Sequence, residues 1–450
     1  MPAKKQTDLG RGDYGDETWD YTPLTGAALD EAFHCALRAH GTFDGTDFVS
    51  FQPSTQKSQD RHVLENIEIG GRVWRLRCIF DGHAGHAAVD FIQRSIVPAL
   101  QARLADAVAQ ADPPAEDAVA GALSGALLAI DETIGTEARA LFPQDISMMS
   151  GEELLVIADD HRNGGSGANH EKLLRCKSGS TALVALLDPE CKELWVASLG
   201  DCTAALCTRR EAGGPWEVVN LSSNHNGVDP EEAARVKSEH PGEEEAMLNS
   251  RVVGTIAVTR ALGDFFCKYP SDFVRRVLVA SDPFPNFSAT SLDGFLSRLR
   301  TPPYVSATPD VRWAKVGSAT EQPSTAEQPP LSDAESSPAE QLLVMFSDGL
   351  PDCVLDDFSC AEPYLRVLPR ILDRASSSKG VNLAAEVVRE TLAGGAEYMP
   401  EMQAARDGED VKAGPEVSSA ERDDRLSQLV TLEEDGKWLD DVTVLVHRLL

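Results

Sequence analysis

Aspartates stand at the boundaries of apolar runs in four segments of the sequence, and their side chains could bind cations. The segments read IFDGH, ASLGDC, MFSDGLPD and LDDVTV, and the aspartates are Asp81, Asp201, Asp348 with Asp352, and Asp440. Carboxylate oxygens, backbone carbonyls and water suit hard divalent cations such as Mg²⁺ or Mn²⁺. Carboxylates buried together are costly unless a cation neutralises them. Two such ions can lower the pKa of a shared water and direct it at phosphorus.

Two further residues extend this pattern. Asp60 precedes the first strand-like run, and His83 follows Asp81 by two positions. An isolated Asp-Gly is most often only a turn, and a lone histidine is most often structural. Several aspartates that each border a buried strand reverse that expectation and favour a metal-binding cage. Histidine transfers protons near neutral pH, so the position of His83 favours a general acid.

The elements that position these residues can be predicted from hydrophobic periodicity. Steps of three and four residues predict one helix over 89–108 and another over 119–134. Strands are expected at 73–80, 342–346 and 442–447, with a hairpin formed by 181–187 and 193–199, and a helical region near 360–396. A helix is also expected to begin at Asp229-Pro230. Strands far apart in sequence and helices in consecutive pairs predict an α+β fold rather than a doubly wound sheet.

Charge and cysteine content exclude several classes of protein. The formal net charge of −31 argues against binding of nucleic acid or an anionic membrane surface. The 9 cysteines form no Cys-x-x-Cys pair, which indicates a reducing intracellular compartment. No apolar run approaches the length of a membrane span. The acidic N-terminal segment lacks an apolar signal, which favours the cytoplasm and leaves the mitochondrial matrix as an alternative.

The polarity of the chain suggests how its domains are organised. Residues 1–44 are polar and are expected to form an N-terminal extension, anchored at Trp19 and Tyr21. Residues 45–450 are expected to form one domain. Its polar or Gly-rich stretches near 142–177, 316–341 and 401–437 are predicted to be disordered insertions.

The order of motifs resembles a known family. QDRHV, FDGHAGH, SGSTALVALL, VASLGDC, NHNGVDPEEAARV, VTRALGDFFCK, FSDGLPD and DDVTVLV resemble the motif series of the metal-dependent, type 2C (PPM-type) Ser/Thr protein phosphatases. The FDGHAG form, Glu239-His240-Pro241, TPPYVSATPDV and the final Asp-Asp are similar to the pyruvate dehydrogenase phosphatase branch of that family. The resemblance implies a four-layer α-β-β-α sandwich, with two central antiparallel sheets flanked by helix pairs.

The resemblance also implies roles for the aspartates. Asp81 would bridge two Mg²⁺ or Mn²⁺ ions, and the Gly82 carbonyl would bind the second ion. Asp348 and Asp440 would hold the first ion. Asp201 and Asp352, with Asp348, match positions that can bind a weaker third ion.

The catalytic roles follow in the same way. Asp60 would orient the attacking water and His83 would protonate the leaving serine or threonine oxygen, with no phosphoenzyme. Where the family often has Glu, this chain has Gln59, which puts the second metal site in doubt. Thr55 replaces the phosphate-binding arginine of many members, and Lys57 or Arg61 are the alternatives, so the phosphate-binding residue stays open.

Other polar residues in these motifs are expected to be structural. Arg260 and Asp264 could form a buried pair that supports the site. A hydrogen bond that orders a loop is favoured over metal ligation for His225. Asp356-Asp357 is expected in a solvated turn.

The predicted function is therefore hydrolysis of phosphoserine and phosphothreonine in a phosphorylated protein, with the pyruvate dehydrogenase complex as a candidate partner. Two alternatives remain open at this point. One is a weak or inactive family member that acts as a binding or regulatory protein. The other is a two-metal hydrolase of small phosphate esters.

Overall fold

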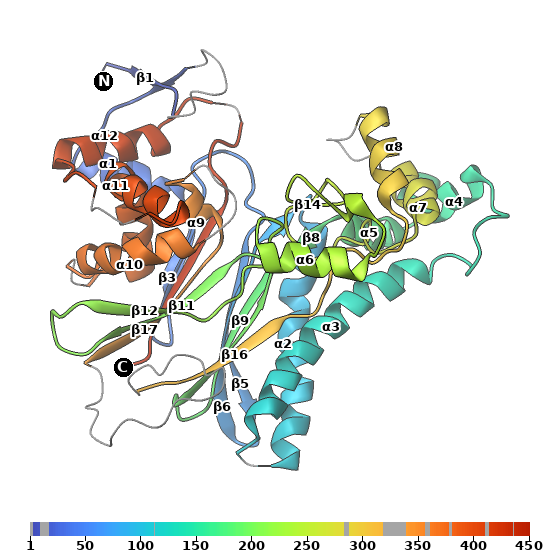
Figure 1. Ribbon diagram of the computed structural model, residues 1–450, viewed down its shortest axis with the longest axis horizontal. Helices are drawn as coiled ribbons and strands as arrows, with labels where there is room; N and C mark the ends of the chain where they lie inside the picture. Colours follow the sequence, from blue (N-terminus) through green and yellow to red (C-terminus); the bar gives the residue numbers. More distant parts are fainter. Residues whose placement is uncertain are drawn as a thin grey trace. The chain divides into compact units, whose positions relative to one another are not determined.

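The computed structural model describes residues 3–9, 18–111, 113–282, 288–317, 339–355, 361–377, 380–409, 414–434 and 436–450. The chain forms two compact units (Figure 1). Unit 1 contains Met1–Asp60, Thr203–Leu221 and Lys315–Leu450, and unit 2 contains Arg61–Cys202 and Ser222–Ala314. Each unit is therefore assembled from stretches that are distant in sequence.

Unit 2 contains a five-stranded sheet in the order β16-β10-β9-β6-β5. Strands β5, β6, β9 and β10 pair antiparallel with one another in that order. The predicted hairpin is confirmed, because β9 and β10 are adjacent and Asp188 accepts backbone hydrogen bonds in the turn between them. The strands are β5 (Arg61–Ile69), β6 (Arg72–Phe80), β9 (Ala182–Leu187), β10 (Glu193–Leu199) and β16 (Asp310–Lys315).

Two long helices, α2 (Ala87–Gln110) and α3 (Glu116–Arg139), lie side by side along this sheet (Figure 1). Both helices are confirmed, because the apolar positions that predicted them are buried in one core with the sheet. The buried side chains include Val89, Ile92, Ile96, Leu100 and Leu104 of α2, and Val119, Leu123, Leu127, Ile130 and Ile134 of α3.

Helix α3 is also long and apolar enough to cross a membrane, with a mean hydropathy of 1.3. Half of that apolar stretch is buried. A core helix of a folded domain meets the same length and hydropathy criteria, so α3 is weak evidence for a membrane span.

The prediction that residues 142–177 form a disordered insertion is wrong. They contain α4 (Gly151–Ala158), a 3₁₀ turn (Asp160–Asn163) and α5 (Ala168–Lys177). Ser150 and Glu153 form a capping box that starts α4, which satisfies backbone N–H groups at its first turn. Leu154 and Leu173 are buried in the core of unit 2, so helix formation in this segment is stabilised by tertiary packing.

Shorter elements complete unit 2. Helix α6 begins at the predicted position, where Asp229 accepts hydrogen bonds from the Glu231 and Glu232 N–H groups. A three-stranded sheet has the order β15-β8-β7, and β13 pairs with β14. The elements are β7 (Gly82–His83), β8 (Gly179–Ser180), α6 (Pro230–Glu239), a 3₁₀ turn (Glu244–Ala246), β13 (Met247–Leu248), β14 (Arg251–Val252), β15 (Leu262–Gly263), α7 (Ser271–Phe273), a π-helix (Val274–Val279) and α8 (Ala289–Arg298).

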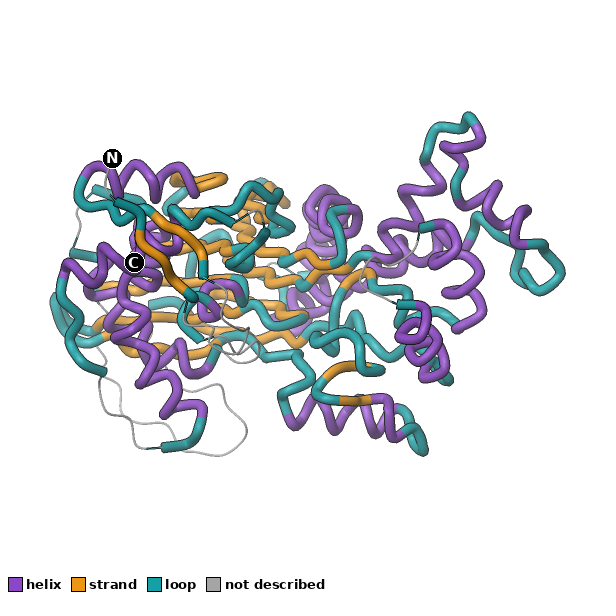
Figure 2. Tube along the Cα trace, turned by 90° about the horizontal axis from the view of Figure 1, so that it is seen from above, coloured by secondary structure: helices purple, strands orange, loops and turns teal. Residues whose placement is uncertain are grey.

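Unit 1 contains a six-stranded sheet in the order β12-β11-β17-β18-β4-β3. All of its pairings are antiparallel. Figure 2 colours the strands orange and the helices purple. The predicted strands at 342–346 and 442–447 are the central pair, β17 and β18. The strands are β3 (Leu37–Phe43), β4 (Thr46–Phe51), β11 (Thr203–Arg209), β12 (Trp216–Asn220), β17 (Glu340–Phe346) and β18 (Val442–Arg448).

Helices form the second layer of unit 1 and share a core with its sheet. The predicted helical region near 360–396 is confirmed as the pair α10 and α11. Buried aromatic side chains join the layers, for example Phe346 of β17 and Tyr364 of α10, whose ring centroids are 5.1 Å apart. The helices are α1 (Ala27–Ala36), α9 (Gly349–Asp352), α10 (Glu362–Ala375), α11 (Leu383–Arg406) and α12 (Ser419–Val430).

The N-terminal segment also differs from its prediction as an extension. Strands β1 (Lys5–Thr7) and β2 (Trp19–Tyr21) pair with each other, and β3 forms an edge of the six-stranded sheet. Leu29 and Phe33 of α1 are buried in the core of unit 1. These residues are folded because the unit's own apolar core covers them.

The two remaining predicted insertions have different outcomes. Within 401–437, α11 continues to Arg406 and α12 is a capped helix with Leu426 and Leu429 buried, which corrects the prediction of disorder. Most of 316–341 lies outside the described residues, as does Asp356-Asp357. The predicted α+β class, with two antiparallel sheets each accompanied by a helix pair, is confirmed.

Candidate functional site

Antiparallel pairing in unit 2 brings Asp81 and Asp201 together. Asp81 follows β6 and Asp201 follows β10, and both strands flank β9, which is preceded by Thr181. The Thr181 N–H donates to the Asp81 carbonyl at 2.9 Å, and the Asp81 N–H donates to Thr181 Oγ1 at 3.2 Å. One carboxylate oxygen of Asp81 lies within 4.8 Å of one of Asp201. Gly82, whose carbonyl is a predicted ligand, is buried in β7 next to Asp81.

The loop that carries Asp201 is held by two buried neighbours. Asn226 Nδ2 donates to Asp201 Oδ2 at 2.8 Å. His225 accepts from the Gly200 N–H at Nδ1 (3.2 Å), and its own backbone N–H donates to the Gly200 carbonyl (2.9 Å). Since Nδ1 accepts, Nε2 carries the proton and donates to Asp310 at 3.1 Å. The prediction that His225 orders a loop is confirmed.

His83 has a carboxylate partner that sequence reasoning missed. Its Nε2 lies 2.8 Å from Oδ2 of Asp264, whose side chain is fully buried. Strand β8 pairs with both β7 and β15, so His83 at the end of β7 and Asp264 just after β15 meet across it. Burial lowers the pKa of His83, but the charge of Asp264, its hydrogen bond and the charge of Asp201 outweigh that effect and raise the pKa.

A signal for Asp264 was present in the sequence. ALGD has the same apolar–Gly–Asp form as SLGD, which contains Asp201. The sequence interpretation instead paired Asp264 with Arg260, which the structure contradicts. Arg260 donates to Glu232 at 2.6 Å and to Asp310 at 2.9 Å.

Gly179 leaves the space that Asp264 occupies. A Cβ at this position would lie 2.2 Å from Asp264 Oδ2. We expect Gly179→Ala to destabilise the fold by about 1–3 kcal/mol through overpacking and to displace the carboxylate from His83. Urea unfolding measures the first effect, and the NMR chemical shifts of the His83 ring measure the second. Gly121→Ala, on the open face of α3, is the control. Unchanged stability and an unchanged ring signal in Gly179→Ala would contradict the prediction.

The Glu232–Arg260 pair also predicts acid sensitivity. Burial raises the pKa of Glu232, but hydrogen bonds from Arg260, Arg235 and Thr259 outweigh that and lower it to about 2. A lowered folded-state pKa contributes stability above the unfolded pKa, and that stability is lost as pH falls from about 4.5 toward 2. We expect Glu232→Gln to remove about 3 kcal/mol of this pH dependence, measured by urea unfolding between pH 2.5 and 6. A variant whose stability falls as steeply as wild type would refute the assignment.

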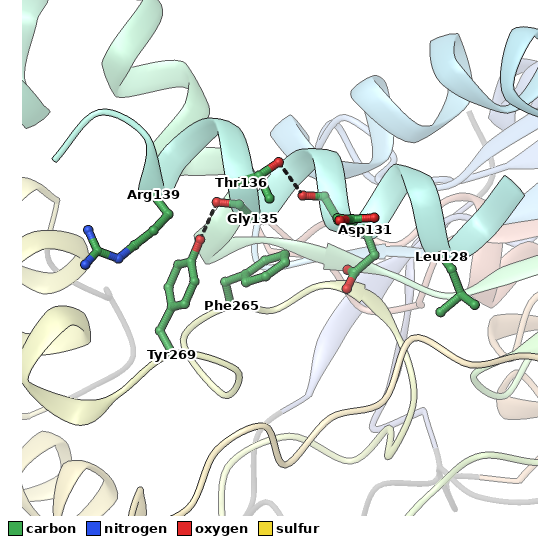
Figure 3. A pocket seen from close by; sticks show the side chains of 8 residues that line it. Leu128, Asp131, Gly135, Thr136, Arg139, Phe265 and Tyr269 are labelled. Atoms are coloured by element: carbon green, nitrogen blue, oxygen red, sulfur yellow. Dashed lines mark hydrogen bonds between the residues drawn. The ribbon is translucent and has the colours of Figure 1, made fainter. Parts of the chain in front are cut away.

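Helix α3 supports the loop that follows Asp264 (Figure 3). Figure 3 shows Phe265 and Tyr269 against Gly135, where a Cβ would lie 2.3 Å from the Phe265 ring. The Tyr269 hydroxyl donates to the Gly135 carbonyl at 2.5 Å, and Asp131 accepts from the Gly263 N–H at 2.8 Å. A pocket of about 460 Å³ lies here, lined by aromatic and charged side chains. These contacts fix the backbone on both sides of Asp264.

The central strand pair of unit 1 gathers a second set of predicted ligands. Asp348 follows β17 and Asp440 precedes β18, and these strands are antiparallel, so both residues lie at one end of the sheet. Ser347 joins Asp60 to this end, because its hydroxyl donates to Asp60 Oδ2 at 2.8 Å. Asp352 lies one turn later in α9, and its N–H donates to the Asp348 carbonyl at 3.2 Å.

Asp441 organises the segment that leads to Asp60. It is 3% exposed and accepts from Gln52 Nε2 at 2.9 Å and from the Gln59 N–H at 2.8 Å. Lys437 Nζ donates to both Asp440 (2.7 Å) and Asp441 (2.9 Å). Gln59 therefore has a structural role through its backbone.

The electrostatics of this cluster fit a hard cation. Burial and the charge of Asp441, with a smaller effect of Asp440, raise the pKa of Asp60 to about 8, despite the hydrogen bond from Ser347. Carboxylates this costly to ionise are stabilised by a bound cation. Carboxylate oxygens are the donors that Mg²⁺ and Mn²⁺ prefer.

The two basic candidates for phosphate binding are in different surroundings. Arg61 is an ion-pair partner of Asp90, at 2.8 Å. Lys57 is exposed, as a solvated charge would be. The phosphate-binding residue therefore stays unassigned.

Comparison with known proteins identifies the family of this chain. The family model for protein phosphatase 2C matches residues 44–361, which is more than half of the sequence. The chain belongs to the protein phosphatase 2C family. The match includes Asp60, Asp81, Asp201 and Asp348, whereas Asp440 lies beyond its end.

Two curated relatives and one solved structure are similar to this chain. A protein phosphatase 2C homologue of Schizosaccharomyces pombe is 31% identical over 57% of this chain and 53% of the relative. The mitochondrial pyruvate dehydrogenase (acetyl-transferring) phosphatase 1 of Saccharomyces cerevisiae is 26% identical over 71% and 54%. The chain thus spans about half the length of the curated relatives it matches. A solved serine-threonine phosphatase 2C from Toxoplasma gondii aligns with a TM-score of 0.45, 15% identity and coverage of 100% and 99%.

The motifs that resemble pyruvate dehydrogenase phosphatase meet in unit 2. The His240 ring stacks on Tyr304 with centroids 4.0 Å apart, and its Nδ1 lies 2.8 Å from Thr301 Oγ1. Glu243 accepts from Thr301 at 2.6 Å and from the Tyr304 hydroxyl. Glu239-His240-Pro241 and TPPYVSATPDV therefore pack against each other and have a structural role within the protein phosphatase 2C fold.

Proposed function

We propose that the chain is a metal-dependent protein phosphatase that acts on phosphoserine and phosphothreonine. The observation that carries this proposal is the His83–Asp264 pair beside Asp81 and Asp201 in unit 2. Hydrolysis of a phosphate monoester requires a cation site for the phosphoryl oxygens and a proton donor for the leaving oxygen. Membership of the protein phosphatase 2C family supports the same chemistry.

The proposed cations are Mg²⁺ or Mn²⁺, two ions with a weaker third. When bound, they lower the pKa of water and offset the negative charge of the phosphoryl group. The ligands in unit 2 are Asp81, the Gly82 carbonyl and Asp201. The ligands in unit 1 are Asp60, Asp348, Asp352 and Asp440.

The protein's own side chains supply the proton transfer and the orientation. Asp264 holds Nε2 of His83, which leaves Nδ1 to protonate the serine or threonine oxygen as it departs. Asp60 orients the attacking water with a carboxylate that Ser347 fixes by a hydrogen bond. The Asp264 side chain is fully buried, which restricts the orientation of the His83 ring that it contacts.

Removal of the metal tests the proposal. We expect exhaustive chelation with EDTA to reduce phosphate release from phosphothreonine and phosphoserine peptides to background, and excess Mn²⁺ to restore it. Nucleotides should be hydrolysed far more slowly than these peptides. Full activity after chelation, or equal activity on nucleotides, would contradict the proposal. Cation binding without phosphate release would instead support a binding or regulatory protein.

The proposed substrate includes phosphorylated pyruvate dehydrogenase. Similar yeast and human proteins are mitochondrial pyruvate dehydrogenase (acetyl-transferring) phosphatases, which supports this proposal, as does the motif contact between His240 and Tyr304. Dephosphorylation of the phosphorylated E1 subunit should be faster than that of an unrelated phosphoprotein at equal concentration. This substrate implies the mitochondrial matrix, which imaging of the tagged full-length protein tests directly. Equal rates on both phosphoproteins would contradict the substrate proposal alone.

A further inference from the structure

Lys437 occupies a distinctive place in unit 1. It lies on the short segment between α12 and β18, next to Trp438, which is buried and donates from its indole N–H to the Leu429 carbonyl at 3.0 Å. This anchor holds the segment, and the Lys437 ammonium contacts Asp440 and Asp441. The ammonium group of Lys437 therefore lies directly beside a predicted metal ligand.

The contacts of Asp440 are asymmetric. Its Oδ1 accepts from Lys437 Nζ at 2.7 Å and from the Asp441 N–H at 2.8 Å. Both of these donors reach the same oxygen. A cation that approaches the Asp440 carboxylate is thus directed to Oδ2. It is then repelled by the ammonium group that contacts Oδ1. Even without Lys437, the Asp441 N–H still orients the carboxylate.

We infer that the charge of Lys437 weakens cation binding at Asp440. The ammonium of Lys437 repels a divalent ion, and its hydrogen bond to Oδ1 limits Asp440 to binding the ion through one oxygen. Both effects keep the ion exchangeable rather than tightly held. This inference rests on the metal-binding part of the proposed function. The repulsion acts over a few ångströms, well within the Debye length, between side chains that are 25% (Lys437) and 43% (Asp440) exposed.

Cation affinity measured directly, without catalysis, tests the inference. Full-length wild type, Lys437→Met and Lys437→Arg are titrated with Mn²⁺ by calorimetry, with free Mn²⁺ followed by electron paramagnetic resonance. We expect Lys437→Met to bind Mn²⁺ at least about tenfold more tightly at one site, and Lys437→Arg to remain near wild type. Lys5→Met is the matched control, because Lys5 pairs with Asp424 at the same 2.7 Å on the surface of unit 1. It should leave the affinity unchanged.

A second variant shows whether the gain acts through Asp440. In Lys437→Met combined with Asp440→Asn, the tenfold gain should disappear, since the two residues act on one contact. Unchanged or weaker Mn²⁺ binding in Lys437→Met would overturn the inference while the proposed function stands. Wild-type protein that binds neither Mn²⁺ nor Mg²⁺ would overturn both.

Discussion

Asp81→Asn lowers the rate of phosphate release from a phosphothreonine peptide by at least about 10³-fold, because a metal ion contributes several kcal/mol of charge stabilisation and each ~1.4 kcal/mol is a factor of ten. An amide keeps the size and the backbone contacts of Asp81 with Thr181 but has no charge. The loss should therefore appear in kcat/KM for every substrate. It is measured by single-turnover assays at saturating Mn²⁺.

The same substitution should leave the fold intact. Asp81 and Asp201 place two carboxylates close together, and removal of one charge relieves their repulsion. We therefore expect the midpoint of thermal unfolding in EDTA to be equal to or above that of wild type. Asp117→Asn, on the exposed first turn of α3, makes the same charge change and should retain full activity. Wild-type activity of Asp81→Asn would refute its role as a ligand.

His83→Gln is expected to lower kcat on phosphopeptides by about 10²–10⁴-fold, which is the usual contribution of a general acid. The reason is that an alkoxide leaving group needs a proton, and Gln cannot supply one. With p-nitrophenyl phosphate the loss should be much smaller, because nitrophenolate is a good leaving group without protonation. Stopped-flow measurement of both substrates separates proton donation from a general loss of structure.

Asp264→Asn extends this prediction to the partner that holds the ring. An amide at this position can no longer stabilise the charged imidazole, so the loss should again be larger for phosphopeptides than for p-nitrophenyl phosphate. Asp188→Asn is the control, because Asp188 is also a buried carboxylate but caps the turn at the far end of β9. It should reduce stability without this substrate dependence. Equal losses on both substrates for Asp264→Asn would show that the residue has only a structural role.

The positions of the aspartates could be predicted from the sequence. An apolar run followed by Asp indicates where a strand ends, and this depends only on the local sequence. The pattern correctly placed Asp81, Asp201 and Asp348 at strand ends. Helices α2 and α3 were also predictable, because a periodic apolar face must be buried whatever covers it. The type 2C motif series was sufficient to identify the family.

The partners of the polar residues could not be predicted in the same way. Arg260 lies four residues from Asp264, yet Arg260 pairs with Glu232 and Asp310, and Asp264 pairs with His83. The His83–Asp264 pair depends on β8 lying between β7 and β15, a register formed by segments about a hundred residues apart. The helices within 142–177 were likewise not predictable from their polar composition, because they are stabilised by packing against the core of unit 2. Sequence alone determined which residues could do the chemistry. The tertiary structure decided which of them meet, because strand pairing and burial are non-local.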